Sequence, residues 1–377
     1  MATDQREWAT ESFIRKCLAE GASPWSLGRD PDDLECFLSL TEEMEVQPIL
    51  HAMLMSNDNK PSWPSVIVKR LHECNRSQFV GFEFRVGELV KVLSRLAGAG
   101  VNGVLLKGIP LAHSHYQFPH HRPSSDVDIL IDRESLETVN SQMREMGYQE
   151  VPDLLFGTVS QQKQFWREGG KGFEHVFEFH TEMNNRPLLA PFGMEHFETR
   201  SEVFTVGGIE LRGPKTPEAF VLAALHRLGH LPGDRRFLWL YDLKLVAEAM
   251  GEDDWELVFK IAQQAECRVL IAESIGELLE AFDSPLSSEV VEWANKNRSY
   301  SGEKSAYYIK PDRTRRSDLR VAILSLPSLL LRVGALFQLA FPNPSYMRNQ
   351  FPAGDKASLL GLHWRRLRQV LSSWIRG

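Results

Sequence analysis

The sequence predicts an α+β protein in which a small mixed-sheet domain lies between two helical regions. Helical periodicity fills both ends of the 377-residue chain, whereas short apolar runs alternate with amphipathic segments between residues 86 and 213. Within that stretch, Gly207 and Gly208 separate two alternating segments, as in a β-hairpin. We therefore expect a helical N-terminal region at 1–85, a mixed α/β domain at 86–213 and a helical C-terminal domain at 214–377.

Composition places the chain among ordinary globular proteins. Hydrophobic residues make up 43% and charged residues 25%, and a net charge of −7 gives no global reason to expect nucleic-acid binding. The four cysteines form no CxxC pair and the first residues lack an apolar signal segment, so we expect free thiols and a cytoplasmic location. The most apolar window, residues 321–341, contains Pro327, Arg332 and Gln338, so no membrane span is expected.

The N-terminal region shows apolar residues at helical spacing. Leu34, Phe37 and Leu38 follow a helix-start signal at Asp30 and Pro31. No cluster of reactive side chains occurs here. We interpret this region as a helical domain, or as a cap over one side of the next domain.

Alternating helices and strands are predicted for the middle region. In chain order we expect a helix over 86–100, strands over 101–107 and 126–132, a helix over 133–147, a strand over 173–182 and a hairpin over 202–213. The alternation in FEHVFEFHTE places Phe177 and Phe179 on one face of the last strand, and Glu178 and His180 on the other.

Helical periodicity returns after the hairpin. Thr216 as N-cap and Pro217 in the first turn form a start signal. Further helices are expected over 235–250, 254–266, 269–282, 288–297, 318–341 and 356–375. Asp242 lies in an otherwise apolar helix, where a buried acid needs a partner such as Arg235 or Arg236.

Two aspartates on one predicted strand give the first indication of a metal site. Asp126 and Asp128 are two residues apart, so both side chains project to the same side of the sheet. Two carboxylates this close repel each other unless a cation lies between them. Magnesium, which prefers oxygen ligands, is the expected ion.

Other residues around this pair favour a phosphate ligand. A turn of Lys107 and Gly108 ends the preceding strand, and a helix begins at once, so its backbone N–H groups could hold phosphate oxygens. Gly108 would allow close approach, and Lys107 would add positive charge. Glu178 offers a third carboxylate. Such a set around two Mg²⁺ ions is what in-line transfer of a phosphoryl or nucleotidyl group requires.

Several polar residues near these carboxylates have two possible roles. Arg122 could neutralise a phosphate, or it could hold its loop by a salt bridge. His180 could contact substrate or order a carboxylate, or it could be a satisfied structural histidine. His226 and His230 have the i, i+4 spacing of a helical Zn²⁺ pair, but no third ligand is evident, so we expect them to line the cleft.

These residues also resemble a known family. The order LLKG, Tyr116, Arg122, DVDILI and a helix ending in MGY is similar to the uncharacterised nucleotidyltransferase family of the polymerase-β-type nucleotidyltransferase superfamily. The likeness continues in VFEFHTE, LHRLGH, FLWLYDLKLV and FPNPSYMR. It covers the chain from about residue 85 to the C-terminus.

The resemblance implies transfer of a nucleoside monophosphate from an NTP to an acceptor, with release of pyrophosphate and the help of two Mg²⁺ ions. By position, Asp126 and Asp128 would bind the metals, and Glu178 would take the place of the third carboxylate. Lys107 and Gly108 stand where the superfamily usually has a Gly-Ser turn. The chain thus departs from the superfamily pattern at that turn, and again at Glu178, where aspartate is commoner.

Two questions stay open at the level of sequence. The acceptor could be a small molecule, a sugar, a peptide, a protein or an RNA. The departures at the turn and at Glu178 also suggest an alternative, a non-catalytic nucleotide-binding or adaptor protein that keeps the fold.

Overall fold

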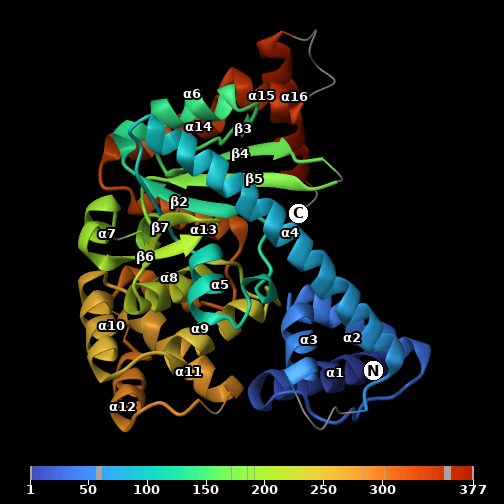
Figure 1. The fold of residues 1–377 in the computed structure, drawn as a ribbon. Helices are drawn as coiled ribbons and strands as arrows, with labels where there is room; N and C mark the ends of the chain where they lie inside the picture. The colour runs from blue at the N-terminus through green and yellow to red at the C-terminus, as the bar shows by residue number, and fades with distance from the viewer. Residues whose placement is uncertain are drawn as a thin grey trace.

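The fold is described from a computed structural model (Figure 1). The structure describes residues 2–56, 62–170, 172–184, 186–190, 192–282, 284–300, 302–351 and 358–375. Helices dominate both ends, and the strands form one mixed sheet and one hairpin, which confirms the predicted α+β class. None of the described helices is both long and apolar enough to cross a membrane.

Four helices open the chain: α1 (Ala2–Glu20), α2 (Pro31–Glu43), α3 (Gln47–Ser56) and α4 (Ser65–Gly98). The Asp30 carboxylate caps α2 as predicted, accepting a hydrogen bond from the backbone N–H of Asp33. The helix predicted from residue 86 is the second half of α4, which is 34 residues long. Figure 1 shows α4 running from the N-terminal helices across the sheet, so it links the first two expected regions.

The central sheet has the strand order β1-β2-β5-β4-β3. Its strands are β1 (Gly103–Leu105), β2 (Val127–Ile131), β3 (Gln149–Val151), β4 (Gln162–Glu168) and β5 (Glu174–His180). β2 and β5 pair in parallel, and the other pairs are antiparallel. The strands predicted around 101–107, 126–132 and 173–182 are confirmed, whereas β3 and β4 were not predicted.

The two faces of this sheet have different roles. One face buries alternate apolar residues of β2 and β5 against α4 and α6 (Leu136–Glu145); these residues are Val127, Ile129, Ile131, Phe177 and Phe179. Because side chains alternate along a strand, Asp128, Glu178 and His180 point to the opposite face. The period of the strands therefore places all three polar groups on one side.

One short helix follows β1, and a second short helix and a hairpin connect β5 to the C-terminal helices. They are α5 (Ile109–His115), α7 (Met194–Arg200), and the hairpin of β6 (Ser201–Val206) and β7 (Ile209–Pro214). Gly207 and Gly208 form the turn of the hairpin with φ values of 56° and 82°, as the glycine pair predicted.

The remaining helices are α8 (Thr216–Gly229), α9 (Leu238–Glu248), α10 (Glu252–Gln264), α11 (Arg268–Phe282), α12 (Ser288–Asn297), α13 (Arg315–Ser325), α14 (Leu329–Ala340), α15 (Pro344–Gln350) and α16 (Leu359–Ile375). Two predictions are wrong in detail. The cap of α8 is Lys215, and Thr216 is the first helical residue. The single helix expected over 318–341 is divided at Pro327, which has no N–H to continue α13, and Ser328 caps α14.

Candidate active site

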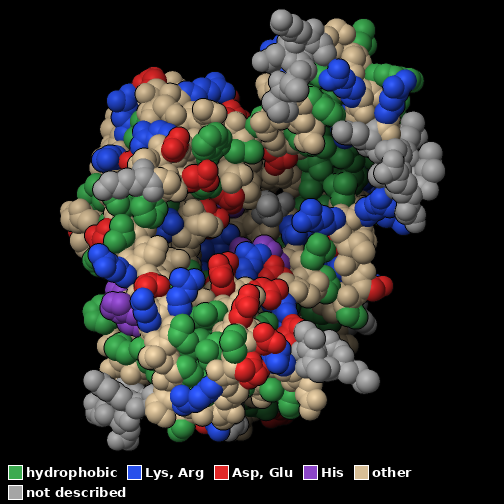
Figure 2. Space-filling model, turned by 90° about the vertical axis from the view of Figure 1, so that its right-hand side faces the viewer, with side chains coloured by type: hydrophobic (Ala, Val, Ile, Leu, Met, Phe, Trp, Pro, Cys, Tyr) green, Lys and Arg blue, Asp and Glu red, His purple; other side chains and the backbone are tan. Residues whose placement is uncertain are grey.

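A cleft of about 580 Å³ lies over the polar face of the sheet. Its walls come from the end of α2, the start of α3, α4, the loop before β2, the strands β4 and β5, and the helices α8 and α9. Figure 2 shows this hollow, with histidine and basic side chains at its floor and acidic side chains at its lower rim. The cleft contains every predicted site residue: Lys107, Gly108, Arg122, Asp126, Asp128, Glu178 and His180.

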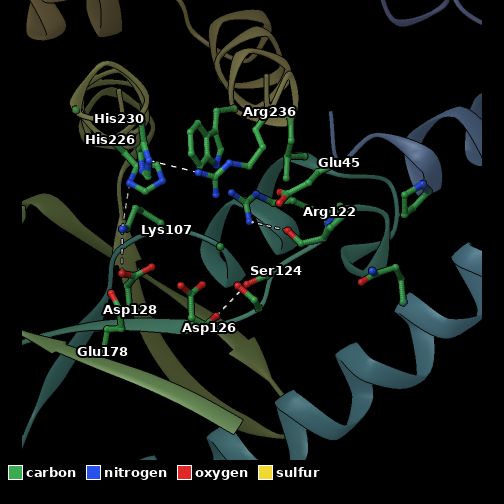
Figure 3. Close-up of a pocket in the computed structure, with 18 of the residues that line it drawn as sticks. Glu45, Lys107, Arg122, Ser124, Asp126, Asp128, Glu178, His226, His230 and Arg236 are labelled. Carbon is green, nitrogen blue, oxygen red and sulfur yellow. Dashed lines mark hydrogen bonds and ion pairs between the residues drawn. The ribbon is translucent and has the colours of Figure 1, made fainter. Parts of the chain in front are cut away.

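The three predicted carboxylates meet in this cleft (Figure 3). Asp128 on β2 lies directly opposite Glu178 on β5, whereas Asp126 precedes β2 by one residue. Asp128, Glu178 and His180 each offer one ligand atom, and these three atoms lie within 4.8 Å of one another. His180 thus belongs to the compact group, and Asp126 lies beside it.

Asp128 is held by close contacts with a lysine and a histidine. Its Oδ1 lies 2.9 Å from Lys107 Nζ and 2.9 Å from His180 Nε2. Burial alone would raise the pKa of Asp128, but Lys107 and His180 lower it well below the usual value. Burial likewise opposes the charge on Lys107, whose pKa Asp128 nevertheless raises. Asp128 is therefore ionised at neutral pH.

Glu178 has the opposite electrostatic environment. Burial, then the charges of Asp128 and Asp126, raise the pKa of Glu178 to about 8. Burial and Asp128 also raise the pKa of Asp126. Gln162 on β4 donates a hydrogen bond of 3.1 Å to Glu178 Oε2 and so orients it. Gln162 was not among the predicted site residues, because no strand was predicted over 162–168.

The turn at Lys107 and Gly108 leads directly into α5, as predicted. Gly108 has a φ of 42°, which few residues other than glycine adopt. A Cβ there would lie 3.3 Å from Ser124 Oγ and 3.6 Å from Arg122 Nη1, so the turn is packed against the loop before β2. Pro110 has no N–H, which leaves fewer backbone donors at this helix start than a phosphate cradle of ordinary residues would offer.

Arg122 makes the salt bridge that was one of its two predicted roles. Its Nε and Nη2 donate to the two Asp242 carboxylate oxygens at 2.9 and 2.8 Å, and Tyr116 Oη donates to the same carboxylate at 2.7 Å. All three side chains are buried. The expectation that Arg235 or Arg236 would pair with Asp242 is therefore wrong. Binding of a phosphate by Arg122 stays a prediction.

Arg235 and Arg236 pair elsewhere. Arg235 contacts Glu7, Glu11 and Glu43 of the N-terminal helices. Arg236 pairs with Asp234 and lies over the Trp239 ring, 3.9 Å from its centroid. Arg235 thus holds the N-terminal helices against the segment before α9.

His226 and His230 line the cleft, as expected. His226 Nδ1 lies 3.3 Å from Lys107 Nζ, and burial together with Lys107 lowers the pKa of His226 well below its usual value. A neutral His226 can accept a hydrogen bond from the lysine. His230 is the C-cap of α8, and its ring centroid lies 4.8 Å from that of His226, but no third potential ligand among the described residues joins the two. Among the described residues, the group around Asp128 is the only cluster of three potential ligands.

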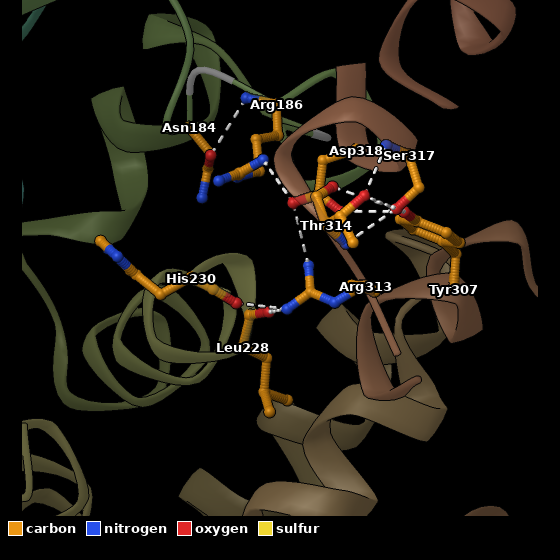
Figure 4. A network of polar contacts seen from close by, with 9 residues as sticks. All are labelled: Asn184, Arg186, Leu228, His230, Tyr307, Arg313, Thr314, Ser317 and Asp318. Atoms are coloured by element: carbon orange, nitrogen blue, oxygen red, sulfur yellow. Dashed lines mark hydrogen bonds and ion pairs between the residues drawn. The ribbon is translucent and has the colours of Figure 1, made fainter. Parts of the chain in front are cut away.

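A second polar network fixes the edge of the cleft (Figure 4). Arg186, which lines the cleft, pairs with buried Asp318 at the start of α13, with Nη1 and Oδ2 3.2 Å apart. Arg313 also contacts Asp318, and its Nη2 donates to the backbone carbonyls of Leu228 (2.8 Å) and His230. Helix α13 therefore positions the end of α8. These residues lie far apart in sequence, and no local pattern indicated them.

A wall from the N-terminal region completes the cleft. Glu42, in the last turn of α2, and Glu45, between α2 and α3, line it. Glu45 has a φ of 58°, unusual for a residue with a side chain. Burial raises the pKa of Glu45. The N-terminal region is therefore part of the site as well as a cover for it.

Comparison with known families decides the classification. A family model described as an uncharacterised nucleotidyltransferase matches residues 30–277. The chain belongs to this uncharacterised nucleotidyltransferase family. The match confirms the family seen in the sequence, but its extent differs from the predicted one: it begins at residue 30 instead of about 85, and it ends before FPNPSYMR. It includes every residue that lines the cleft. A comparison with curated proteins finds no match.

Proposed function

We propose that the protein is a cytoplasmic, Mg²⁺-dependent nucleotidyltransferase that moves a nucleoside monophosphate from an NTP to an acceptor and releases pyrophosphate. One observation carries this proposal. Three carboxylates converge on one sheet face, next to a Lys-Gly turn, inside the region that matches the nucleotidyltransferase family.

The donor set of the cleft fits magnesium. Asp126, Asp128 and Glu178 offer hard carboxylate oxygens, which Mg²⁺ prefers, and they are the residues that would hold two ions. When bound, the ions would neutralise the triphosphate and favour attack by the acceptor. His180, 2.9 Å from Asp128, would keep that carboxylate oriented.

The neighbouring cations suit the triphosphate. Lys107 supplies a positive charge at the turn, and Gly108 lets a phosphate approach the backbone. Arg122 is held beside Gly108 by its ion pair with Asp242, which uses Nε and Nη2, so its Nη1 on the Gly108 side could donate to a phosphate oxygen. The acceptor would enter along the wall that contains Glu42 and Glu45, and its class stays open among small molecules, sugars, peptides, proteins and RNA.

A transfer assay tests the proposal. The protein is incubated with Mg²⁺, each labelled NTP and candidate acceptors, and the products are followed by intact mass. The Asp126→Ala/Asp128→Ala variant should lose transfer. Asp132→Ala is the matched control, because Asp132 is an exposed acid directly after β2 and outside the cleft. Label transfer that survives the double substitution would refute the proposal.

One observation favours the alternative of a non-catalytic nucleotide-binding or adaptor protein. The Lys107 ammonium already contacts Asp128 at 2.9 Å, so part of the carboxylate charge is balanced without a metal. This alternative predicts that NTP binds whereas no pyrophosphate is released with any acceptor. Lys107→Ala separates the two readings, because the enzyme should lose transfer, whereas an adaptor has no turnover to lose.

A further inference from the structure

The helix α14 leaves one of its sides open to solvent. Its inner side packs on the 154–159 segment through Leu331, Ala335 and Leu339. Its outer side presents Leu329, Leu330, Val333, Leu336 and Phe337, which are between 54% and 81% exposed. These residues recur at helical spacing and so form one stripe. Isolated exposed apolar residues are common, but a continuous stripe of this length indicates a binding surface.

The helix α16 adds a second stripe. Leu360 (83% exposed), Trp364 (57%) and Leu367 (48%) have i, i+4, i+7 spacing. The two helices touch, because Arg366 Nη1 donates to the Leu339 carbonyl at 2.6 Å and the Phe341 and His363 rings are 6.4 Å apart. We call the exposed apolar residues of both stripes the outer apolar face.

The charge around this face is strongly one-sided. From Leu319 to Gly377 the chain contains a single acid, Asp355, and eight lysines or arginines, although the whole protein has a net charge of −7. Arg348, Arg365 and Arg368 are exposed. Exposed apolar side chains on a segment with an excess of basic residues favour a partner that is both apolar and anionic.

Two other occupants fit these facts less well. A second copy of the chain would bring arginines opposite arginines, and neither α14 nor α16 contains an acid that could pair with them. A helix that spans a membrane needs about 20 apolar residues, whereas α14 is 12 residues long. An anionic lipid surface offers acyl chains to the apolar stripe and negative headgroups to the arginines, and Trp and Phe are favoured at that depth.

We propose that the outer apolar face of α14 and α16 binds the surface of membranes that contain anionic lipids. The helices lie in the interface, and the cleft remains in water. This inference does not depend on the proposed function, because the family match ends at residue 277, before these helices begin. It is also compatible with a protein that has no spanning helix among its described residues.

Vesicle co-sedimentation of the full chain tests the proposal. The vesicles contain phosphatidylcholine alone, or phosphatidylcholine mixed with phosphatidylglycerol. The protein should sediment with the mixed vesicles, and much less with phosphatidylcholine or at high salt. Leu330→Glu/Phe337→Glu should weaken binding about a hundredfold, since two large apolar side chains no longer enter the interface. Arg365→Gln/Arg368→Gln should weaken it by about twentyfold or more, and only on the anionic vesicles.

Matched controls distinguish binding by this face from non-specific adsorption to vesicles. Trp8→Glu changes an aromatic residue that is 73% exposed on α1, and Arg76→Gln changes an exposed arginine on α4. Both should bind vesicles as the wild type does. All variants should keep the wild-type thermal unfolding midpoint and, without vesicles, the wild-type level of nucleotide transfer. Because vesicle binding is measured by sedimentation, the lipid test still holds if the protein transfers no nucleotide.

Five results would overturn the proposal. They are equal binding to both kinds of vesicle, an equal loss of binding in the control variants, and the absence of binding to either vesicle. The fourth is a dimer, seen by light scattering, that Leu330→Glu/Phe337→Glu dissociates, because a second copy would then cover the face. The fifth is RNA binding that the arginine variants abolish, in a protein that does not bind vesicles, because the partner of this face would then be RNA.

Discussion

Asp242 holds the loop that leads into the site carboxylates. It accepts hydrogen bonds from Arg122 and Tyr116, which lie 120 and 126 residues away in sequence, and all three side chains are buried. A buried ion pair contributes little net stability, but removing one partner leaves the other charge uncompensated. The pair therefore fixes the position of the loop more than it adds to the stability of the fold.

We predict that Asp242→Ala destabilises the protein by about 3–5 kcal/mol, because Arg122 would stay buried without a counter-charge. Glu145→Ala is the control. It breaks an ion pair with Arg95 in which both side chains are about half exposed, so it should cost less than about 1 kcal/mol. Chemical denaturation measures both values. Similar losses in the two variants would show that Arg122 finds another partner or water.

Histidine burial predicts a dependence of stability on pH. His121 is 8% exposed, and burial followed by His120 and His51 lowers the pKa of His121 to about 4, from 6.5. The unfolded chain binds the proton more readily between these values, so stability is lost as the pH falls from about 6.5 towards 4. His121→Phe should reduce the loss between pH 7 and pH 5 by about 2 kcal/mol.

Denaturant titrations at the two pH values measure this difference. The comparison of wild type with His121→Phe isolates one histidine from the other groups that titrate in the same range. The same pH dependence in both proteins would mean that His121 is accessible to protons in the folded state.

At the scale of elements, the turn between β1 and α5 depends on glycine. Gly108→Ala should destabilise the protein by about 1–2 kcal/mol, because its φ of 42° strains a residue with a Cβ and Ser124 lies 3.3 Å from that Cβ. Gly87→Ala is the control, since a Cβ there meets no atom within 4 Å inside α4. It should stabilise the helix by up to about 1 kcal/mol.

Thermal unfolding and NTP binding are the measurements for this pair of variants. Under the proposed function, only Gly108→Ala should also weaken NTP binding. Unchanged stability in Gly108→Ala would show that the turn relaxes into a conformation that alanine tolerates.

Elements with a clear period could be predicted from sequence, and the others could not. The residues of β5 alternate between polar and apolar, those of β2 are mostly apolar, and the hairpin has a glycine pair at its turn. Local residues therefore predict all three elements. In β4 the run QKQFWRE buries only Phe165, and its strand form depends on pairing with β5. The division of 318–341 follows from Pro327, which lacks the N–H that a continuous helix would need at this position.

The residues of the site also divide into those that local sequence predicts and those that it does not. Asp128, Glu178 and His180 were predictable because a period of two fixes their common face. The bond between Arg122 and Asp242, the salt bridge between Arg186 and Asp318, and the place of Glu45 depend on long-range packing, for which one sequence has no local signal. Tertiary contacts therefore decide the walls of the cleft, and strand geometry decides its floor.

At the scale of the whole molecule, the N-terminal helices are packed into the main core. Arg15 lies over the Phe237 ring, 4.5 Å from its centroid, and the Leu238 N–H donates to the Met44 carbonyl at 3.1 Å. One continuous cluster of buried side chains includes Phe13 and Phe37 as well as residues of α8, α9 and α11. The wall of the cleft near Glu45 is thus supported by the N-terminal helices and by the helices α8, α9 and α11.

This continuity predicts that the N-terminal helices and α8 unfold together. Phe13 is 5% exposed, and its ring lies 5.5 Å from those of Trp25 and Trp63, so Phe13→Ala should cost about 3–5 kcal/mol. Hydrogen exchange followed by mass spectrometry should show an equal loss of protection in peptides of α2 and α8, because one core stabilises both. Loss confined to α2 would instead define an N-terminal unit that opens alone, and the wall of the cleft near Glu45 could then open without unfolding the sheet.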